Sequence, residues 1–351
     1  MAHPLSGDLD HVLECTRPMW EELRGRRIFV TGGTGFYGCW LLETFLWANH
    51  RLGLDASAVV LTRNPDAFAR RVPHLAIDPA LRFVAGDVRD FDFPEGEFSH
   101  VVNAATDASS YVAASQLAYL DVIAKGTQRT LEFARQSGAR KFLFASSGGV
   151  YGRQPPELER IDEDYLGAPD VTGPGACYPE GKRFAELLCV LYAREHGIEP
   201  KLARGFSFLG PYMPLGGRSA ITGFMRDALN GTTIKVNSDG TTYRTYLYGA
   251  DLAIWLWTIL FKGVSCRPYN VGSGAAVSIA DTARAVAKAF DRQVHVDIAG
   301  TPDPTKLPER YVPSLARAES ELGLYQTIGF DEAIARSVAW YSRRPPAMVN
   351  E

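Results

Sequence analysis

Apolar residues fall into two patterns that alternate along the first two thirds of the chain. Short apolar runs, typical of buried strands, are followed by longer segments with apolar residues at helical spacing. The expected strands are residues 28–30, 59–61, 82–84, 100–104, 141–145 and 200–204, and the expected helices are 39–49, 115–137 and 178–196. This alternation predicts βαβ units and a parallel sheet flanked by helices.

Outside this alternation the pattern is less regular. Residues 1–24 are expected to form a helical lead-in, with an apolar stripe that Pro18 interrupts. The last third predicts a smaller α/β lobe, with strands at 234–236 and 269–272 and a helix at 279–290. Two stretches rich in proline and glycine, 153–176 and 210–218, are expected to be loops at the mouth of the sheet, where such folds bind ligands.

The first expected strand runs directly into a glycine-rich turn. Gly32, Gly35 and Gly38 are spaced G-x-x-G-x-x-G between that strand and the next helix. Glycines allow a tight turn and let backbone N–H groups approach a pyrophosphate, and a helix N-terminus favours negative charge. We therefore predict a dinucleotide site here, with Phe36 and Tyr37 in the same turn.

The predicted fold class is α/β, a Rossmann-type doubly wound parallel sheet with a smaller C-terminal α/β lobe. The NAD(P)-binding domain is expected over residues 25–205, with 245–270 returning to it. The substrate-binding lobe is expected over residues 206–244 and 271–351.

The end of the second expected strand favours NADP over NAD. An NAD site often has an acidic residue there to hold the ribose 2′-hydroxyl, but this chain has Thr62-Arg63-Asn64. Arg63 is suited to pair with a 2′-phosphate, and the alternative is that it stacks beside the adenine or is solvated. Asp87 is expected to accept a hydrogen bond from the adenine amino group. Val88, Ala104 and Ala105 complete the predicted cofactor site.

Composition narrows the class of protein. Lys and Arg (37) are fewer than Asp and Glu (40), so nucleic acid is not an expected partner. The five cysteines are scattered without a CxxC pair, which favours a reducing compartment and predicts neither a disulfide framework nor a metal site. The most apolar window, 252–261, is too short to span a bilayer, and the N-terminus has no signal-peptide pattern. We expect a cytoplasmic protein with no membrane partner.

Tyr178 and Lys182 are the candidate catalytic pair. They are four residues apart on one expected helix and therefore share a face. A free tyrosine has a pKa near 10, so lowering it to neutrality takes roughly three units, about 4 kcal/mol. A nearby ammonium and a positive nicotinamide ring both favour the phenolate. Ser147, at the end of the fifth expected strand, is placed to hold a substrate hydroxyl against Tyr178.

Three blocks together resemble the signature of the extended short-chain dehydrogenases/reductases: Thr31 to Gly38, Ser146 to Gly152 and Tyr178 to Glu186. That family contains nucleotide-sugar 4-epimerases, 4,6-dehydratases, UDP-glucuronate decarboxylases and 4-ketoreductases. The resemblance implies that Tyr178 is the acid/base and that Lys182 binds the nicotinamide ribose and lowers the pKa of the tyrosine. It also implies that the Ser147 hydroxyl polarises the substrate.

Two further blocks resemble the substrate segments of the family. Arg204 to Pro211 is similar to a block in which an asparagine contacts the substrate diphosphate, and Ser207 stands at that place. Arg244 to Asp251 is similar to a block whose arginine grips the diphosphate of a sugar nucleotide, and a guanidinium matches phosphate oxygens well. The resemblance implies a nucleoside-diphosphate sugar as substrate, with Arg244 as a ligand; the alternative for Arg244 is a surface ion pair.

The residues after Ser147 bear on the reaction. Dehydratases of the family have an Asp-Glu pair just before the valine of this block, and decarboxylases have a glutamate at the second place. This chain has Gly148 and Gly149 there. The glycines favour an epimerase, then a ketoreductase, then a dehydratase, although Tyr178 to Arg183 resembles some decarboxylases and dehydratases. The nearby acids Asp162, Glu163 and Asp164 are expected to be solvated loop charges.

Two alternatives and a partner remain open. A non-catalytic NAD(P)-binding protein would not need Ser147, Tyr178 and Lys182 together. A reductase of a non-nucleotide substrate is favoured by Arg63-Asn64-Pro65 but not by the arginine at 244. The family resemblance also implies a homodimer through helices 115–137 and 178–196. The spacing of Phe133, Leu188 and Tyr192 fits either a face toward the partner or the core.

Overall fold

The structure is a computed structural model that describes residues 3–106, 115–216 and 219–343. It divides into two compact units. The first unit comprises Met1–Gly152, Ala168–Gly205 and Ala253–Tyr269, and the second comprises Arg153–Gly167, Phe206–Leu252 and Asn270–Glu351. These bounds differ from those expected from the sequence chiefly at 153–167, which belong to the second unit, and at the returning segment, which begins at residue 253.

A seven-stranded sheet has the order β11-β6-β5-β4-β1-β2-β3. Its strands are β1 (Arg27–Thr31), β2 (Ser57–Thr62), β3 (Leu81–Ala85), β4 (His100–Asn103), β5 (Lys141–Ser147), β6 (Glu199–Gly205) and β11 (Pro268–Val271). From β1 the chain runs outward through β2 to β3, then returns to β4 on the other side and continues to β6; the pairs among these six strands are parallel. The predicted doubly wound α/β class is confirmed.

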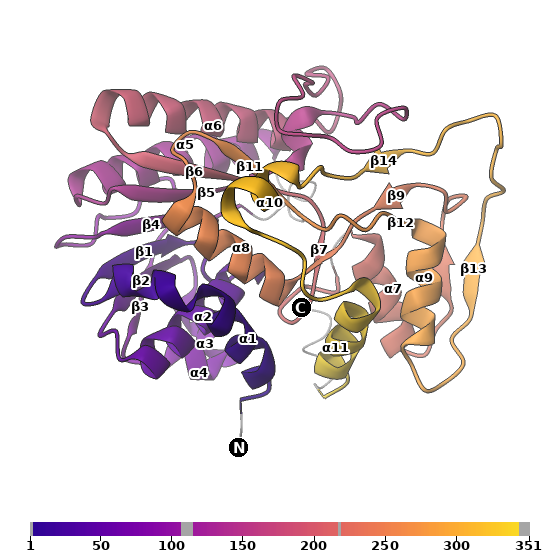
Figure 1. The fold of residues 1–351 in the computed structure, drawn as a ribbon, viewed down its shortest axis with the longest axis horizontal. Helices are drawn as coiled ribbons and strands as arrows, with labels where there is room; N and C mark the ends of the chain where they lie inside the picture. The colour runs from indigo at the N-terminus through magenta and orange to yellow at the C-terminus, as the bar shows by residue number, and fades with distance from the viewer. Residues whose placement is uncertain (1–2, 107–114, 217–218, 344–351) are drawn as a thin grey trace. The chain divides into compact units, whose positions relative to one another are not determined.

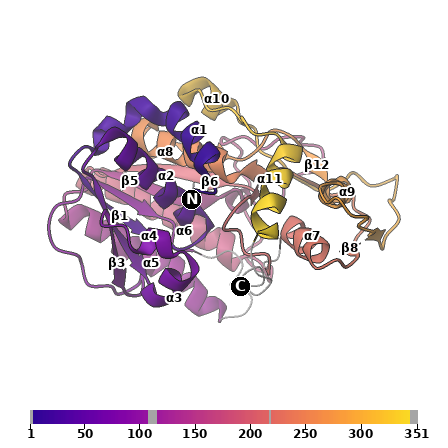
Figure 2. The same ribbon diagram turned by 90° about the horizontal axis from the view of Figure 1, so that it is seen from below.

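Helices cover both faces of this sheet. Figures 1 and 2 show α5 (Gln116–Gln136) and α6 (Cys177–His196) on one face, and α2 (Phe36–Leu52) with α8 (Gly249–Lys262) on the other. Two short helices, α3 (Pro65–Arg71) and α4 (Pro73–Ala76), connect β2 to β3. Beneath α5 and α6, a cluster of aromatic rings centred on Phe29 and Phe133 fills the core, with ring centroids 4.4 Å apart.

The N-terminal segment packs on the first unit. It forms α1 (Ser6–Thr16) and a 3₁₀ helix, η1 (Arg17–Leu23), and the expected stripe of Leu9, Val12, Leu13, Trp20 and Leu23 is buried. The Trp20 ring lies 4.7 Å from that of Trp257 on α8. The indole of Trp47, on α2, donates a hydrogen bond of 2.8 Å to Asp10. These contacts make residues 6–23 an integral layer of the unit.

The second unit is built from short elements. Three small sheets pair β7 with β10, β12 with β9 and β14, and β13 with β8. Helix α7 packs against α9, as Figure 2 shows. The strands are β7 (Phe208–Leu209), β8 (Ile234–Val236), β9 (Tyr243–Arg244), β10 (Leu247–Tyr248), β12 (Val277–Ser278), β13 (Val296–Ile298) and β14 (Arg310–Tyr311), and the helices are α7 (Ala220–Leu229), α9 (Ile279–Lys288), α10 (Ala316–Leu322) and α11 (Phe330–Ser342).

Part of the expected 210–218 loop, residues 217–218, lies outside the described residues. Among the helices that the structure describes, none combines the length and the apolar character needed to cross a membrane.

Candidate active site

The turn between β1 and α2 requires glycine at two positions, because a side chain there would clash with backbone atoms. Gly32 has a φ of +71°, and a Cβ there would lie 2.3 Å from the backbone carbonyl of Ala104, at the end of β4. A Cβ on Gly38 would lie 2.3 Å from the backbone of Gly33. Gly35 forms the N-cap of α2 without a side-chain cap. The turn therefore brings bare backbone to the N-terminus of a 17-residue helix, as a pyrophosphate requires.

The other predicted cofactor residues lie at neighbouring strand ends. Phe36 is buried and Tyr37 half-buried in the first turn of α2. Val88 is buried after β3, while Ala104 and Ala105 follow β4 directly and are half-buried. The structure thus brings these residues to the carboxyl edge of β1, β3 and β4, where open α/β sheets bind ligands.

Arg63 and Asp87 lie at the edge of this region. Arg63 is exposed just after β2. The Asp87 carboxylate accepts bonds of 2.7 Å and 2.9 Å from the Arg89 guanidinium. That hydrogen bond chiefly lowers the pKa of Asp87, and the charge of Arg63 contributes. A carboxylate has about four acceptor positions, so Asp87 retains capacity for another donor.

Lys182 is buried beneath Tyr178 on α6. Its Nζ donates to the Ala145 carbonyl (2.6 Å) and to the Thr106 hydroxyl (3.2 Å). The ammonium lies 5.9 Å from the centroid of the Tyr178 ring. Burial lowers the pKa of Lys182 to about 7, against the opposing charge of Glu186. The lysine is therefore a cation near its titration point, one helical turn from a half-buried phenol.

Ser147 and the two glycines form a compact corner at the end of β5. The Ser147 hydroxyl accepts a hydrogen bond of 3.1 Å from the Gly149 N–H and caps a short 3₁₀ helix, η2 (Gly148–Tyr151). A Cβ on Gly149 would lie 3.3 Å from the Ser147 Oγ and 3.4 Å from the Cβ of Pro179. Because these contacts are tight, a larger residue at 149 would displace the serine or α6.

A buried ion pair, which sequence reasoning did not single out, supports this corner. Glu186 accepts hydrogen bonds from Ser146 (2.5 Å) and from Arg204 (2.7 Å and 3.0 Å). Burial lowers the pKa of Arg204, but bonding to Glu186 outweighs it and the pKa is raised. Glu186 stands four residues after Lys182 and eight after Tyr178, and that helical spacing was the available signal.

In the second unit, Arg244 has an arginine neighbour that the sequence analysis missed. β9 and β14 pair in parallel, with Tyr243 opposite Arg310 and Arg244 opposite Tyr311. Arg244 is half-buried and donates to the Tyr243 carbonyl (3.0 Å). Arg310 lies over the Tyr243 ring at 4.8 Å, and its buried Nε has no hydrogen-bond partner among the described residues. Because paired residues share a face of a sheet and successive residues alternate, Arg244 and Arg310 project to opposite faces.

Ser207 is half-buried between β6 and β7, where its carbonyl accepts a hydrogen bond of 3.0 Å from the Leu247 N–H. Asp251, at the end of the arginine block, is fully buried and accepts bonds from Thr327 and Ile328. These hydrogen bonds therefore fix the end of the block Arg244 to Asp251 that lies farther from Arg244.

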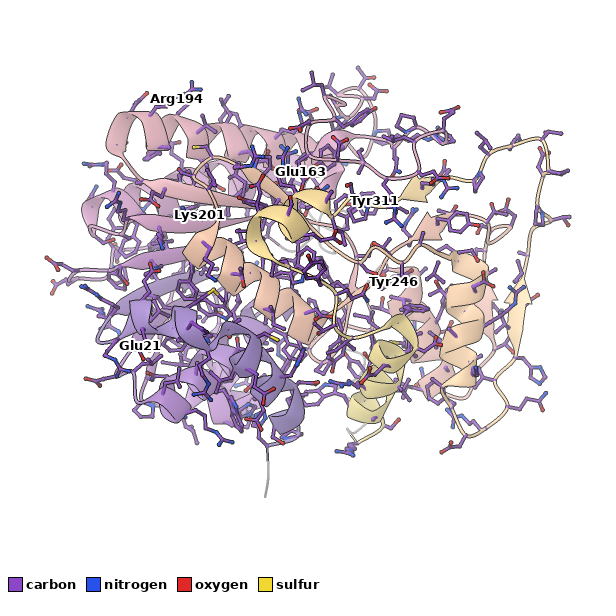
Figure 3. All side chains as sticks on the ribbon, viewed as in Figure 1. Glu21, Glu163, Arg194, Lys201, Tyr246 and Tyr311 are labelled. Atoms are coloured by element: carbon purple, nitrogen blue, oxygen red, sulfur yellow. The ribbon has the colours of Figure 1, made fainter. Side chains whose placement is uncertain are left out.

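The expectation that residues 162–164 are solvated charges is wrong for Glu163. Its carboxylate is buried, accepts a hydrogen bond of 2.8 Å from the Asn270 N–H and lies 3.8 Å from Arg317 (Glu163 is labelled in Figure 3). Asp164 is exposed and pairs with Arg317 at 2.5 Å. Glu163 is thus a structural group that ties 153–167 to the rest of the second unit.

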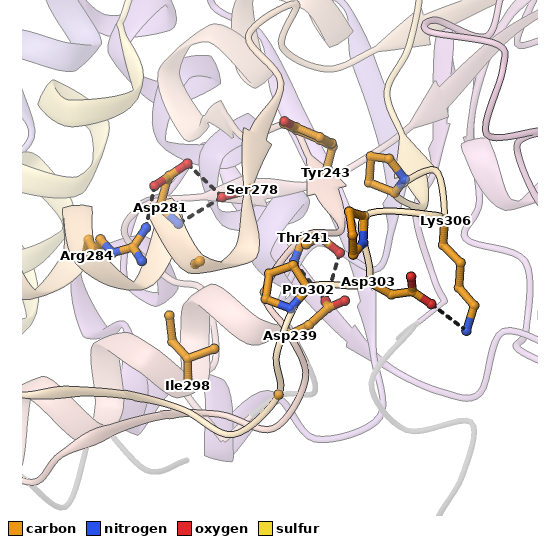
Figure 4. Close-up of a pocket in the computed structure, with 15 residues that line it drawn as sticks. Asp239, Thr241, Tyr243, Ser278, Asp281, Arg284, Ile298, Pro302, Asp303 and Lys306 are labelled. Carbon is orange, nitrogen blue, oxygen red and sulfur yellow. Dashed lines mark hydrogen bonds and ion pairs between the residues drawn. The ribbon is translucent and has the colours of Figure 1, made fainter.

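The second unit also contains an open cavity of about 580 Å³ between β9, α9 and residues 298–308. Its acidic side chains form hydrogen bonds or ion pairs with other residues of the cavity wall. Figure 4 shows Asp281 bonded to Ser278 and Arg284, Asp303 paired with Lys306, and Asp239 accepting from Thr241. These internal bonds leave the cavity without a convergent set of catalytic groups.

Of the two alternatives for Phe133, Leu188 and Tyr192, the structure favours the core. The Phe133 side chain is 1% exposed in the core of the first unit, and Leu188 and Tyr192 are half-buried against that core. The exposed apolar residues of α6 are Phe184, Leu187 and Leu191.

Several known proteins have sequences similar to that of this chain. The sequence profile described as "NAD dependent epimerase/dehydratase family" matches residues 28–272. UDP-glucuronic acid decarboxylase 1 of Danio rerio is 27% identical over 318 residues, 91% of this chain and 73% of that protein. UDP-glucuronic acid decarboxylase 6 of Arabidopsis thaliana is 29% identical over 299 residues, 85% of this chain and 83% of that protein.

Among solved structures, the UDP-glucose 4-epimerase of Thermus thermophilus, in complex with NAD, has a TM-score of 0.73 and 28% sequence identity. The match covers 90% of this chain and 98% of that one. Because the family profile matches well over half of the sequence, the chain belongs to the NAD-dependent epimerase/dehydratase family.

Proposed function

We propose that this chain is an NAD(P)-dependent 4-epimerase of a nucleoside-diphosphate sugar. The observation that carries the proposal is the corner formed by Ser147, Tyr178 and Lys182, with glycines at 148 and 149. It contains a hydroxyl, a phenol and a buried cation, but no carboxyl group in the places where dehydratases and decarboxylases have one. Such a corner is suited to moving one proton at a time.

The glycine turn fits a dinucleotide, because any Cβ at Gly32 or Gly38 would strike backbone at 2.3 Å. Exposed Arg63 favours a 2′-phosphate and hence NADP, whereas the similar epimerase structure carries NAD. When bound, the nicotinamide ring would accept a hydride from C4 of the sugar and return it.

The chain's own residues would manage the proton. Tyr178 accepts the proton of the C4 hydroxyl, and the Ser147 hydroxyl holds the same oxygen in place. The Lys182 ammonium favours the phenolate form of Tyr178. Its hydrogen bond to the Ala145 carbonyl fixes it beneath the ring. Small residues at 148 and 149 leave room for the keto sugar to turn over before the proton is returned.

The second unit would supply the diphosphate ligands. Arg244 presents positive charge to an anion, and a guanidinium group matches phosphate oxygens well. Ser207 is the proposed second ligand.

UDP-glucuronate decarboxylation is the second candidate, favoured by the names of the two relatives. Against it stands Gly149, which supplies no carboxyl group at the place where decarboxylases of the family have a glutamate. A homodimer through α5 and α6 is also proposed, supported by the exposed Phe184, Leu187 and Leu191. Light scattering of the wild type and of Leu187→Glu would test it, with the dimeric mass expected only for the wild type.

The experiment that tests the function uses freshly purified protein without added cofactor. UDP-, dTDP-, GDP- and CDP-hexoses and UDP-glucuronate are each incubated with it, and the products are separated by chromatography. An epimerase interconverts a hexose pair and releases oxidised NAD(P) on denaturation. Release of carbon dioxide from UDP-glucuronate would replace epimerisation by decarboxylation, and turnover that consumes added NADPH would replace it by ketoreduction. No turnover of any of these substrates, together with bound cofactor, would favour a non-catalytic protein.

A further inference from the structure

Two histidines and a buried glutamate converge on the first unit, away from the residues discussed so far. His3 precedes α1, Glu43 lies in the middle of α2 and His74 lies on α4. Their ligand atoms all lie within 4.8 Å of one another. The Nε2 atoms of the two histidines are 3.4 Å apart, and the carboxylate oxygens lie 3.3 Å from His3 and 2.7 Å from His74.

These separations fit a tetrahedral metal. Two nitrogen ligands, each about 2.1 Å from zinc, are about 3.4 Å apart at the tetrahedral angle. The separations of the His3 Nε2 from the His74 Nε2 and from the Glu43 Oε2 match this value. The shorter distance of 2.7 Å joins His74, whose side chain is 45% exposed, to the other carboxylate oxygen, Oε1.

The hydrogen bonds of the cluster indicate which ring nitrogen of each histidine carries the proton. The Leu5 N–H donates to Nδ1 of His3 (3.2 Å), so a neutral His3 carries its proton on Nε2. His74 donates from its own Nε2 to Glu43 at 2.7 Å. Two N–H groups therefore converge on one carboxylate whose side chain is 4% exposed. A cation can take their place if the Nε2 proton of each neutral imidazole moves to Nδ1, and for His3 this shift costs the Leu5 hydrogen bond.

We propose that His3, Glu43 and His74 form a divalent-metal site, with zinc as the preferred ion. Two imidazoles with one carboxylate favour zinc over magnesium or calcium, which prefer oxygen ligands. Three protein ligands leave the fourth position to water. The ion would fasten the segment before α1 to α2 and α4, joining residues 71 positions apart.

This role is structural and independent of the proposed reaction. Zinc bound only by the folded chain raises its stability by mass action. Because α2 begins at the glycine turn, the site would also hold the helix that carries the dinucleotide residues. We expect modest affinity, because each histidine must move its proton from Nε2 to Nδ1 and His3 must break the Leu5 contact.

The test uses protein whose affinity tag has been removed, stripped with chelator and titrated with ZnCl₂ in a calorimeter. One equivalent is expected to bind, with affinity at least tenfold lower in His74→Ala and in His3→Ala. Both side chains lie at the surface, so these variants should fold. His50→Ala, an exposed histidine on the same helix as Glu43, is the matched control and should bind like the wild type.

Two further readouts separate a site from adventitious binding. Cobalt in place of zinc should give the visible absorption bands of a four-coordinate ion in the wild type and in His50→Ala, but not in His74→Ala. Zinc should raise the melting temperature of the wild type by a few degrees (~3 °C) and leave that of His74→Ala unchanged. No binding, or binding lost equally in the His50 control, would overturn the proposal.

Discussion

Lys182 in the first unit and Arg244 in the second are both cations with a proposed role in the reaction, yet they are held in opposite ways. Lys182 is 2% exposed and bonds to a backbone carbonyl and a hydroxyl, neither of which carries a charge. Arg244 is half-buried at a short strand beside an aromatic ring 5.8 Å away. Burial lowers the pKa of the lysine to about 7, whereas an arginine stays charged at every ordinary pH.

The difference separates chemistry from binding. A cation near its titration point responds to the charge on its neighbour, which suits a group that must stabilise a phenolate during part of a cycle. A permanent cation suits a substrate group, such as a diphosphate, whose charge does not change. We therefore expect changes around Lys182 to act on turnover and changes around Arg244 to act on substrate affinity.

The largest expected effect is that of Tyr178→Phe. Removing the hydroxyl removes the proton acceptor, so kcat should fall by roughly 10³-fold or more while bound cofactor remains. Turnover and the cofactor content of the same preparation are measured together. Tyr192→Phe, a half-buried tyrosine on the same helix, is the control. If Tyr178→Phe turned over like the wild type, Tyr178 would not be the proton acceptor, and the first unit would lose its proposed catalytic role.

Gly32→Ala should abolish cofactor binding. The new Cβ would lie 2.3 Å from the backbone at Ala104, and the φ of +71° disfavours any side chain. We expect cofactor content to fall by about 100-fold, or the melting temperature to drop by several degrees, because such strain is costly. Gly35→Ala is the contrast, since its nearest protein atom is 3.5 Å away and the fold should survive. Equal stability and equal cofactor content in wild type and Gly32→Ala would contradict the steric argument.

Arg244→Ala should raise KM for the nucleotide sugar by about 10-fold to 100-fold with little change in kcat. A hydrogen bond to a charged group contributes about 1.5–3 kcal/mol, which corresponds to that range. Arg284→Ala, an exposed arginine paired with Asp281, controls for loss of surface charge. An unchanged KM would point to a substrate without a diphosphate.

The smallest expected effect is that of Glu186→Gln. The charge of Glu186 raises the pKa of Lys182, which is about 7. Removal of that charge should therefore lower the pKa of Lys182 below neutrality. The ammonium form is then lost at lower pH, and the alkaline limb of the activity profile should move down by roughly one pH unit. The profile from about pH 5 to 9 is the measurement, and activity at the acid end should be retained. A limb that stays in place would assign Glu186 to structure alone.

Much of the fold was predictable because the first unit repeats one simple pattern. Every expected strand from β1 to β6 exists within a few residues, since short runs of two to four apolar side chains are typical of strands in a covered sheet. The second unit was less readable. Strands of two residues, such as β7, β9 and β14, are too short to show a period.

The site residues also fall into a group that the sequence predicted and a group that it did not. Gly32, Tyr178 and Lys182 could be read from local spacing, because a turn or a helix alone brings them together. Arg310 beside Tyr243, Glu186 beside Arg204, and His3 beside His74 depend on contacts between distant segments. Glu163 was misjudged for the same reason, since only the chain at 270 and 317 makes it a buried group.

Trp20 and Trp257, which pack together, belong to a set of tryptophans that makes fluorescence specific for the first unit. Five of the six tryptophans (20, 40, 47, 255 and 257) belong to the first unit, and Trp340 alone belongs to the second. Indole emission should therefore follow the unfolding of the first unit almost exclusively. In Trp340→Phe the emission would come from that unit only, while far-ultraviolet dichroism reports both. If the two signals then melt at different temperatures, the units lose their structure separately, and ligands can be assigned to whichever unit they protect.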